Sequence, residues 1–153
     1  MADLKQLARE LVPYLEPYLL SLRSGYVAAT AYTPTYTGGT TAGTTTYNNQ
    51  VGYYVRIAEV VYFTAFVGWT AATGTGDARV SLPLTAKNVA SLRYTCAVRT
   101  DTVTFAASAP QGLIQPNTAY VTLYSPVSNG GSTAVAIEAA GFIDVSGMYF
   151  VDA

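Results

Sequence analysis

From about residue 51 onward, short runs of alternating apolar and polar residues are separated by turn-rich clusters such as ATGTGD, APQGLIQPNT and SPVSNGGS. Alternation of this kind predicts half-buried β-strands, and the Gly, Pro, Asn and Asp clusters predict the turns between them. The predicted strands are Gly52–Ile57, Val60–Trp69, Ala78–Leu82, Leu92–Arg99, Thr102–Ala106, Ala119–Tyr124, Ala134–Ile137 and Phe142–Val151. This many short strands at such spacing predicts a mainly β fold, a jelly-roll-like antiparallel β-sandwich.

The first 25 residues show helical spacing instead. Apolar residues recur there every three or four positions, at Leu4, Leu7, Leu11, Leu15, Tyr18 and Leu22. Asp3 is a suitable N-cap and Gly25 a suitable stop. Pro13 and Pro17 each remove a backbone hydrogen bond, so the pattern predicts a kinked helix or two short helical pieces. Because an isolated helix of this length is marginal in water, we expect the apolar seam to self-associate or to dock on another protein.

The chain therefore divides into three predicted regions. Residues 1–25 form a helical anchor or oligomerisation segment. Residues 26–51 form a Thr/Gly/Tyr-rich arm with a first edge strand at Tyr32–Thr37, around Pro34. Residues 52–153 form the β-sandwich domain.

The segment from Tyr53 to Trp69 is too apolar for a hairpin with one solvated face. Read as a hairpin that turns at Ala58-Glu59, its second arm places Val61, Phe63, Ala65, Val67 and Trp69 on one face and Val60, Tyr62, Thr64, Phe66 and Gly68 on the other. The first face is expected to fill the sandwich core. Tyr62 and Phe66 are expected to be covered by a neighbouring subunit or by the N-terminal arm.

Composition supports assembly and argues against several classes of partner. The 153 residues are 50% hydrophobic and only 11% charged, against about 25% charged in an average soluble domain. Eight basic and nine acidic residues leave a net charge of -1, so we expect no nucleic-acid binding. The uncharged apolar runs are too short to span a membrane, and the charges near the N-terminus argue against a signal peptide. A surface with so little charge favours an obligate oligomer over a monomer.

The sequence offers little catalytic chemistry. The absence of histidine excludes a Ser-His-Asp triad and removes the commonest metal ligand. The single cysteine, Cys96, lies in an alternating run and is expected to be a small buried strand residue. The motif GTGDAR lacks the lysine of a phosphate-binding loop and is expected to be a hairpin turn. We therefore expect no catalytic residues, no metal and no cofactor, although paired carboxylates that cleave sugars stay an alternative.

Four motifs, taken in order, resemble a β-sandwich module that recurs in tailed-bacteriophage virion proteins. They are the run Thr33-Pro34-Thr35-Tyr36-Thr37, the hairpin positions Gly52, Tyr54, Arg56 and Val60, the run Ser81-Leu82-Pro83, and the terminal run Ser146-Gly147-Met148-Tyr149. The resemblance spans about residues 32–150. One departure is the hairpin turn, where the family usually has glycine followed by Asn or Lys and this chain has Ala58-Glu59.

The resemblance implies a non-enzymatic virion protein, typically a homotrimer, of the tail-fibre, head-fibre or capsid-decoration type. A protein that decorates the capsid or forms a short head fibre is the first hypothesis, with the major capsid protein or another virion protein as its partner. The alternative is a tail-fibre-type adhesin that recognises host surface glycans. A glycan-cleaving spike is a third hypothesis. All three place the protein in the virion.

Overall fold

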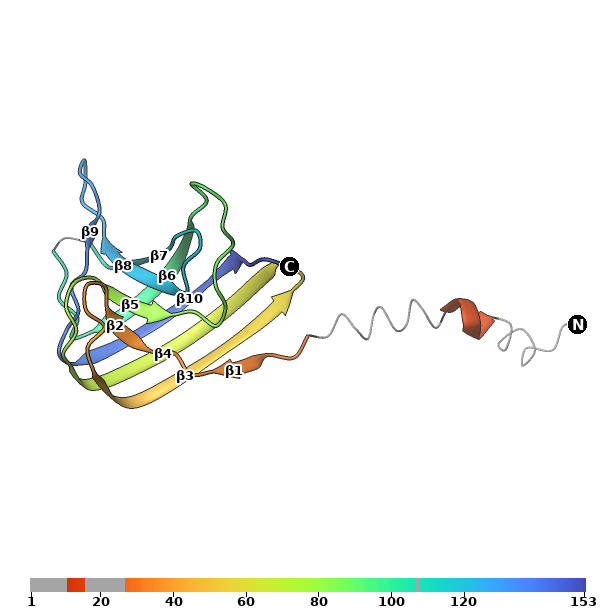
Figure 1. The fold of residues 1–153 in the computed structure, drawn as a ribbon, viewed down its shortest axis with the longest axis horizontal. Coiled ribbons are helices and arrows are strands. Elements are labelled where there is room, and N and C mark those ends of the chain that lie inside the picture. The colour runs from red at the N-terminus through yellow and green to blue at the C-terminus, as the bar shows by residue number, and fades with distance from the viewer. Residues whose placement is uncertain (1–10, 16–26, 107) are drawn as a thin grey trace, which may run out of the picture.

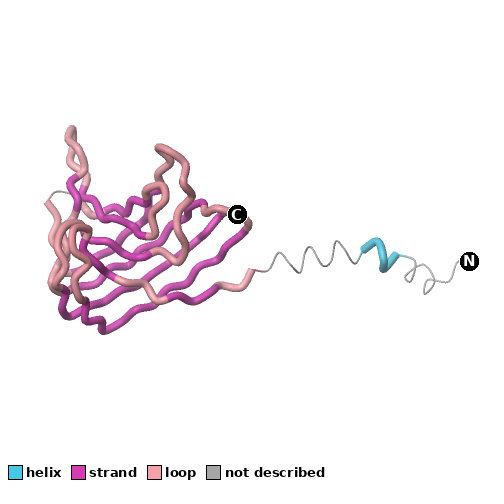
Figure 2. The backbone as a smooth tube through the Cα atoms, viewed as in Figure 1, coloured by secondary structure: helices cyan, strands magenta, loops and turns pink. Residues whose placement is uncertain are grey.

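The fold is that of one antiparallel sheet curled upon itself, as seen in a computed structural model that describes residues 11–15, 27–106 and 108–153 (Figure 1). Its strands in chain order are β1 (Thr30–Tyr32), β2 (Tyr36–Gly38), β3 (Thr45–Ile57), β4 (Val60–Ala72), β5 (Ala78–Ser81), β6 (Tyr94–Asp101), β7 (Gln111–Ile114), β8 (Tyr120–Ser125), β9 (Thr133–Ala134) and β10 (Gly141–Phe150). Figure 2 shows that strands and loops make up the β region; among the described residues, helix is found at residues 11–15. The predicted mainly β class is confirmed.

The sheet has two halves that face each other. Its strand order is β1-β3-β4-β10-β6-β7-β8-β5-β2, with β9 paired to β8. The bend lies in β6, because Ala97–Asp101 pair with β10 whereas Tyr94–Cys96 pair with β7. The long strands β3, β4 and β10 form one half, and the short strands β7, β8, β5 and β2 form the other, which gives a sandwich-like arrangement (Figure 1).

The inward faces of the two halves make one hydrophobic core. On β4 the five residues Val61, Phe63, Ala65, Val67 and Trp69 are all buried, as their alternation predicts. Trp69 stacks on Tyr36 of β2 with ring centroids 3.9 Å apart, so this pair joins the two halves across the core. The polar atoms of both side chains form hydrogen bonds with the backbone of Glu138. Trp69 Nε1 donates to the Glu138 carbonyl, and the Glu138 N–H donates to Tyr36 Oη.

The edge strand β2 and the segment before it contact β3 through hydrogen bonds from β3 side chains to their backbone, rather than through a ladder of backbone hydrogen bonds. Gln50 donates through Nε2 to the Pro34 carbonyl at 2.7 Å, and Thr45 donates through Oγ1 to the Tyr36 carbonyl at 2.8 Å. The Tyr36 N–H donates to Tyr47 Oη at 2.8 Å. A register shift in β3 on either side of Tyr47 accompanies this contact, as expected where a β-bulge redirects a side chain.

The hairpin of β3 and β4 has the two-residue turn that the sequence predicts. Ile57 pairs with Val60, and Ala58 in the turn has φ +52°, a left-handed conformation that favours glycine. The family resemblance places glycine at this point, and in this chain Ala58 takes the left-handed conformation despite its Cβ. Further along the hairpin, Gly52 leaves room for the ring of Tyr32, which lies where a Cβ would stand.

Several predicted strand boundaries are wrong. β3 begins at Thr45 rather than at Gly52, and the single edge strand predicted at Tyr32–Thr37 is two strands, separated at Pro34 because proline cannot donate to a ladder. The predicted strand Thr102–Ala106 is loop. A strand was missed at Gln111–Ile114, inside a cluster whose Pro and Gln residues resemble a turn.

Candidate functional site

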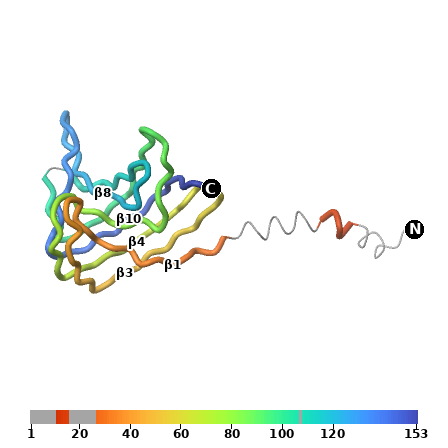
Figure 3. The backbone as a smooth tube through the Cα atoms, viewed as in Figure 1, coloured from red at the N-terminus to blue at the C-terminus, as the bar shows by residue number. Residues whose placement is uncertain are grey.

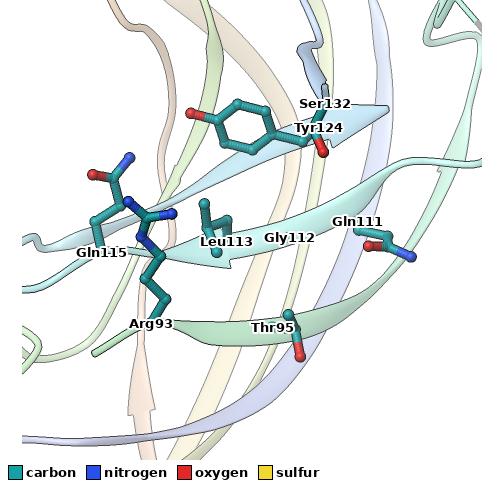
Figure 4. A pocket seen from close by; sticks show the side chains of 8 residues that line it. All are labelled: Arg93, Thr95, Gln111, Gly112, Leu113, Gln115, Tyr124 and Ser132. Carbon is teal, nitrogen blue, oxygen red and sulfur yellow. The ribbon is translucent and has the colours of Figure 1, made fainter. Parts of the chain in front are cut away.

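A polar groove lies on the outer face of β6, β7 and β8. It has a volume of about 480 Å³ and is lined by Arg93, Thr95, Gln111, Gly112, Leu113, Gln115, Tyr124 and Ser132. Figure 4 shows Leu113 in the middle, with Arg93 and Gln115 at one end, Gln111 and Thr95 at the other, and the ring of Tyr124 alongside. Guanidinium, amide and hydroxyl groups thus surround an apolar floor and one aromatic ring.

Strand register explains why these side chains meet. Thr95 pairs with Leu113, and Gln111 pairs with Tyr124, so these residues alternate with the inward-facing Cys96, Ile114 and Leu123. Continuing the same register by one residue places Arg93 opposite Gln115. Three consecutive strands of the chain, paired side by side, therefore supply one surface.

Two loops border the groove. The loop after β5 ends at Arg93, and the loop after β8 contains Ser132; Figure 3 shows both rising on the same side of the short-stranded half. The first loop is fixed to the core by Tyr149, whose Oη donates to the Leu84 carbonyl at 2.9 Å and accepts from the Leu84 N–H at 3.2 Å. The Lys87 N–H of the same loop donates to the Phe150 carbonyl. The groove wall is therefore tied to β10.

The charge of the groove is positive and is not neutralised within it. None of its lining residues is acidic. Within the described part of the chain, the two ion pairs join Lys87 to Glu59 and Arg99 to Asp144, so Arg93 takes part in neither. Next to the groove, the Arg79 guanidinium lies over the Tyr120 ring, 4.2 Å from its centroid. Such a surface offers hydrogen-bond donors, planar amides and aromatic faces to a polar ligand.

Most of the predicted interface residues of the N-terminal segment lie outside the described residues, namely Leu4, Leu7, Tyr18 and Leu22. Leu11 and Leu15 lie in the helical residues 11–15 and are about half exposed. Tyr62 is also half exposed, on the outer face of β4, and Phe66 on the same face packs against Phe142 with ring centroids 5.6 Å apart. The structure brings Tyr62 and Phe66 onto one sheet face, and their role as interface residues stays a prediction.

Three acidic residues in the described part of the chain are engaged with groups other than a second carboxylate. Glu59 and Asp144 are held in the two ion pairs, and Glu138 accepts a hydrogen bond from the Thr104 N–H. Among the described residues, no group of three or more His, Cys, Asp or Glu side chains is placed to hold a metal ion. Nor does any helix in that part of the chain have the length and hydrophobicity needed to cross a membrane. Burial raises the pKa of the Cys96 thiol to about 12, which keeps it protonated and unreactive at neutral pH.

Sequence reasoning did not find the groove. Its central strand, β7, lies in a run that composition assigns to a turn, although Gln111–Ile114 does alternate between exposed and buried positions. That alternation is one of burial in the folded chain, and the sequence Gln-Gly-Leu-Ile does not itself alternate between polar and apolar residues. Arg93, Gln111 and Tyr124 lie on one surface because β6, β7 and β8 pair with one another, and no short stretch of the sequence indicates that pairing.

Comparison with known proteins gives a likeness of fold. No protein-family model matches the sequence, and no curated protein matches it. Among solved structures, the crystal structure of the Dettilon tailspike protein is similar, with a TM-score of 0.60 over 82% of this chain at 13% sequence identity. The similar region covers 24% of the tailspike chain, so this chain corresponds in fold to about a quarter of that protein.

Proposed function

We propose that this chain is a structural component of a tailed-phage virion whose β domain binds host surface glycans in the groove over β6, β7 and β8, without cleaving them. The observation that carries the proposal is the groove itself, with its aromatic ring, amides and guanidinium around an open floor. A sugar ring presents an apolar face that stacks on an aromatic side chain and hydroxyl groups that pair with amides and arginine.

The fold likeness supports an attachment role more than decoration of a capsid. The similar solved structure is a tailspike protein, and the phage motifs named above point to the same class of particle. We therefore place the adhesin hypothesis ahead of the capsid-decoration and head-fibre hypothesis. The latter stays a prediction, which binding to empty capsids would test.

The proposal that the domain binds without hydrolysis rests on the lining of the groove. Retaining and inverting glycosidases use two carboxyl groups on either side of the scissile bond. The lining residues include none. A groove with this lining can hold a sugar by stacking and hydrogen bonding, whereas proton transfer to a glycosidic oxygen would need an acid from elsewhere.

A glycan array probed with the full-length chain tests the proposal. We expect binding to a subset of bacterial surface glycans and at least a tenfold loss of affinity for Tyr124→Ala, since about 1.4 kcal/mol of lost stacking corresponds to a factor of ten. Tyr124→Phe is the matched control, because it keeps the ring and should retain most of the affinity. Binding that is unchanged in Tyr124→Ala would refute the groove as the site. Release of reducing ends from a bound polysaccharide would refute the non-enzymatic part.

A further inference from the structure

A second surface, on the opposite side of the domain from the groove, is largely apolar, and the described part of the chain leaves it partly exposed. The outward side chains of β3, β4 and β10 form it, and we call it the outer apolar face. Six large apolar residues on this face are between 37% and 52% exposed: Val51, Tyr53, Ile57, Tyr62, Met148 and Phe150. A single exposed apolar residue is ordinary, but six on one sheet face are unusual for a solvated surface.

Register makes the face continuous. Val55 pairs with Tyr62, and Tyr62 pairs with Met148, so the three strands place apolar side chains in one row. Val60, paired with Ile57 on one side and Phe150 on the other, makes a second row. The buried core occupies the inward face of these same strands. At the end of this half that carries the β3–β4 hairpin, both faces of the sheet are therefore apolar, which is typical of a sheet covered on both sides.

The shape of the face suits a flat, protein-sized partner. The rows that carry the exposed apolar residues run from Val51 to Ile57 of β3, about 20–24 Å along the strands, and three strands span about 14 Å, which gives roughly 300 Å². A standard interface buries about 800 Å² on each partner, so this face supplies more than a third of one and the surface around it supplies the rest. The face is not completely flat. An apolar hollow of about 300 Å³ lies between Tyr53, Val55 and Tyr62 and can receive a side chain of the partner.

The charge of the face favours a second copy of this chain. Its charged residue Asp144 lies at one end and is neutralised by Arg99 of the neighbouring strand β6, whose Nη2 lies 2.7 Å from Asp144 Oδ2. Two copies can therefore bring this face together without repulsion between like charges. A strongly acidic or basic partner, by contrast, would find no unpaired charge on it to match.

We propose that the outer apolar face is the contact surface between copies of this chain, with Tyr62 near its centre. The face lies on one half of the curled sheet and the groove on the other half. Copies that associate through the face therefore keep their grooves free and display them together. This inference stands on the exposed apolar residues and does not depend on a ligand in the groove.

Light scattering on the purified full-length chain, over a range of concentrations, tests the inference. We expect an oligomer whose dissociation constant rises at least tenfold in Tyr62→Glu, because the change places a charge at the centre of the face. Phe105→Glu is the matched control: Phe105 is 40% exposed and lies outside the face, so its substitution should leave the oligomer intact. Ser146→Arg is a second variant on the face, at an exposed polar position paired with Thr64, and should weaken the oligomer without disturbing the core.

Three outcomes would overturn the inference. A monomeric wild-type chain at all concentrations would do so. So would an oligomer that both Tyr62→Glu and Ser146→Arg leave unchanged while each variant keeps its native circular dichroism, because another segment would then hold the copies together. An oligomer that Phe105→Glu weakens as much as the face variants would show a general effect of added charge. Glycan binding serves as a separate readout, since loss of association should leave the groove of each single chain able to bind.

Discussion

Replacing Tyr149 by phenylalanine removes one hydroxyl from the core and leaves the ring in place. Tyr149 is fully buried, and its Oη makes two hydrogen bonds with the backbone of Leu84, one donated and one accepted. The substitution leaves the Leu84 N–H and carbonyl without these partners. The affected loop is also the one that ends at Arg93 in the groove wall.

The expected cost follows from the two abandoned backbone groups. A buried polar group without a partner costs about 1–3 kcal/mol. Leu84 is only half-buried, so water can reach part of its backbone, and the lower end of the range, about 1 kcal/mol, applies to each of the two groups. We expect the free energy of unfolding to fall by about 2 kcal/mol in all. With a slope of about 2 kcal/mol per molar urea, the unfolding midpoint should fall by about 1 M.

Urea unfolding at one protein concentration, followed by tryptophan fluorescence, measures this change. Tyr53→Phe is the matched control, since Tyr53 is half exposed and loses no hydrogen bond that the described residues make, and it should shift the free energy by less than about 0.5 kcal/mol. Amide exchange at Leu84 should also become faster in Tyr149→Phe. A midpoint that moves no further than in the control would refute the claim that this hydroxyl holds the loop.

Three further changes test other parts of the structure. Burial raises the pKa of both Cys96 and Tyr36 to about 12, so the folded chain keeps protons that the unfolded chain releases; stability is full below pH 9 and should fall as the pH rises towards 12. Urea midpoints that stay constant from about pH 8 to about pH 11 would contradict this. Gly147→Ala should lower the free energy of unfolding by about 1–3 kcal/mol, because its Cβ would lie 2.9 Å from Cys96 Sγ. Adding Cys96→Ala should recover part of that loss in a double-mutant cycle, and strict additivity would argue against the clash. Ala58→Gly should stabilise the chain by about 0.5–1 kcal/mol, since Ala58 has φ +52°, and a lower melting temperature would count against strain at the turn.

Local pattern was sufficient for the β class and for the inward face of β4. Side chains of the strand alternate between its two faces. In the segment from Val61 to Trp69, every residue on one of these faces is apolar, so that face is assigned to the core. Local pattern was not sufficient for β7, because Pro and Gln residues around Gln111–Ile114 carry the statistics of a turn. It also failed at Tyr32–Thr37, where one alternating run was divided between the two ends of the sheet.

The sequence by itself determined that this chain forms a β core with little charge, without histidine and with a hairpin too apolar for one solvated face. These properties follow from the amino-acid composition or from the order of residues that are close together along the chain. The tertiary structure alone decided which side chains share a surface: it gathered Arg93, Gln111 and Tyr124 into a groove, and it left Tyr62 uncovered beside Met148. The physical reason is that strand order and register are set by packing of the whole sheet, so residues far apart in sequence become neighbours without any local signal.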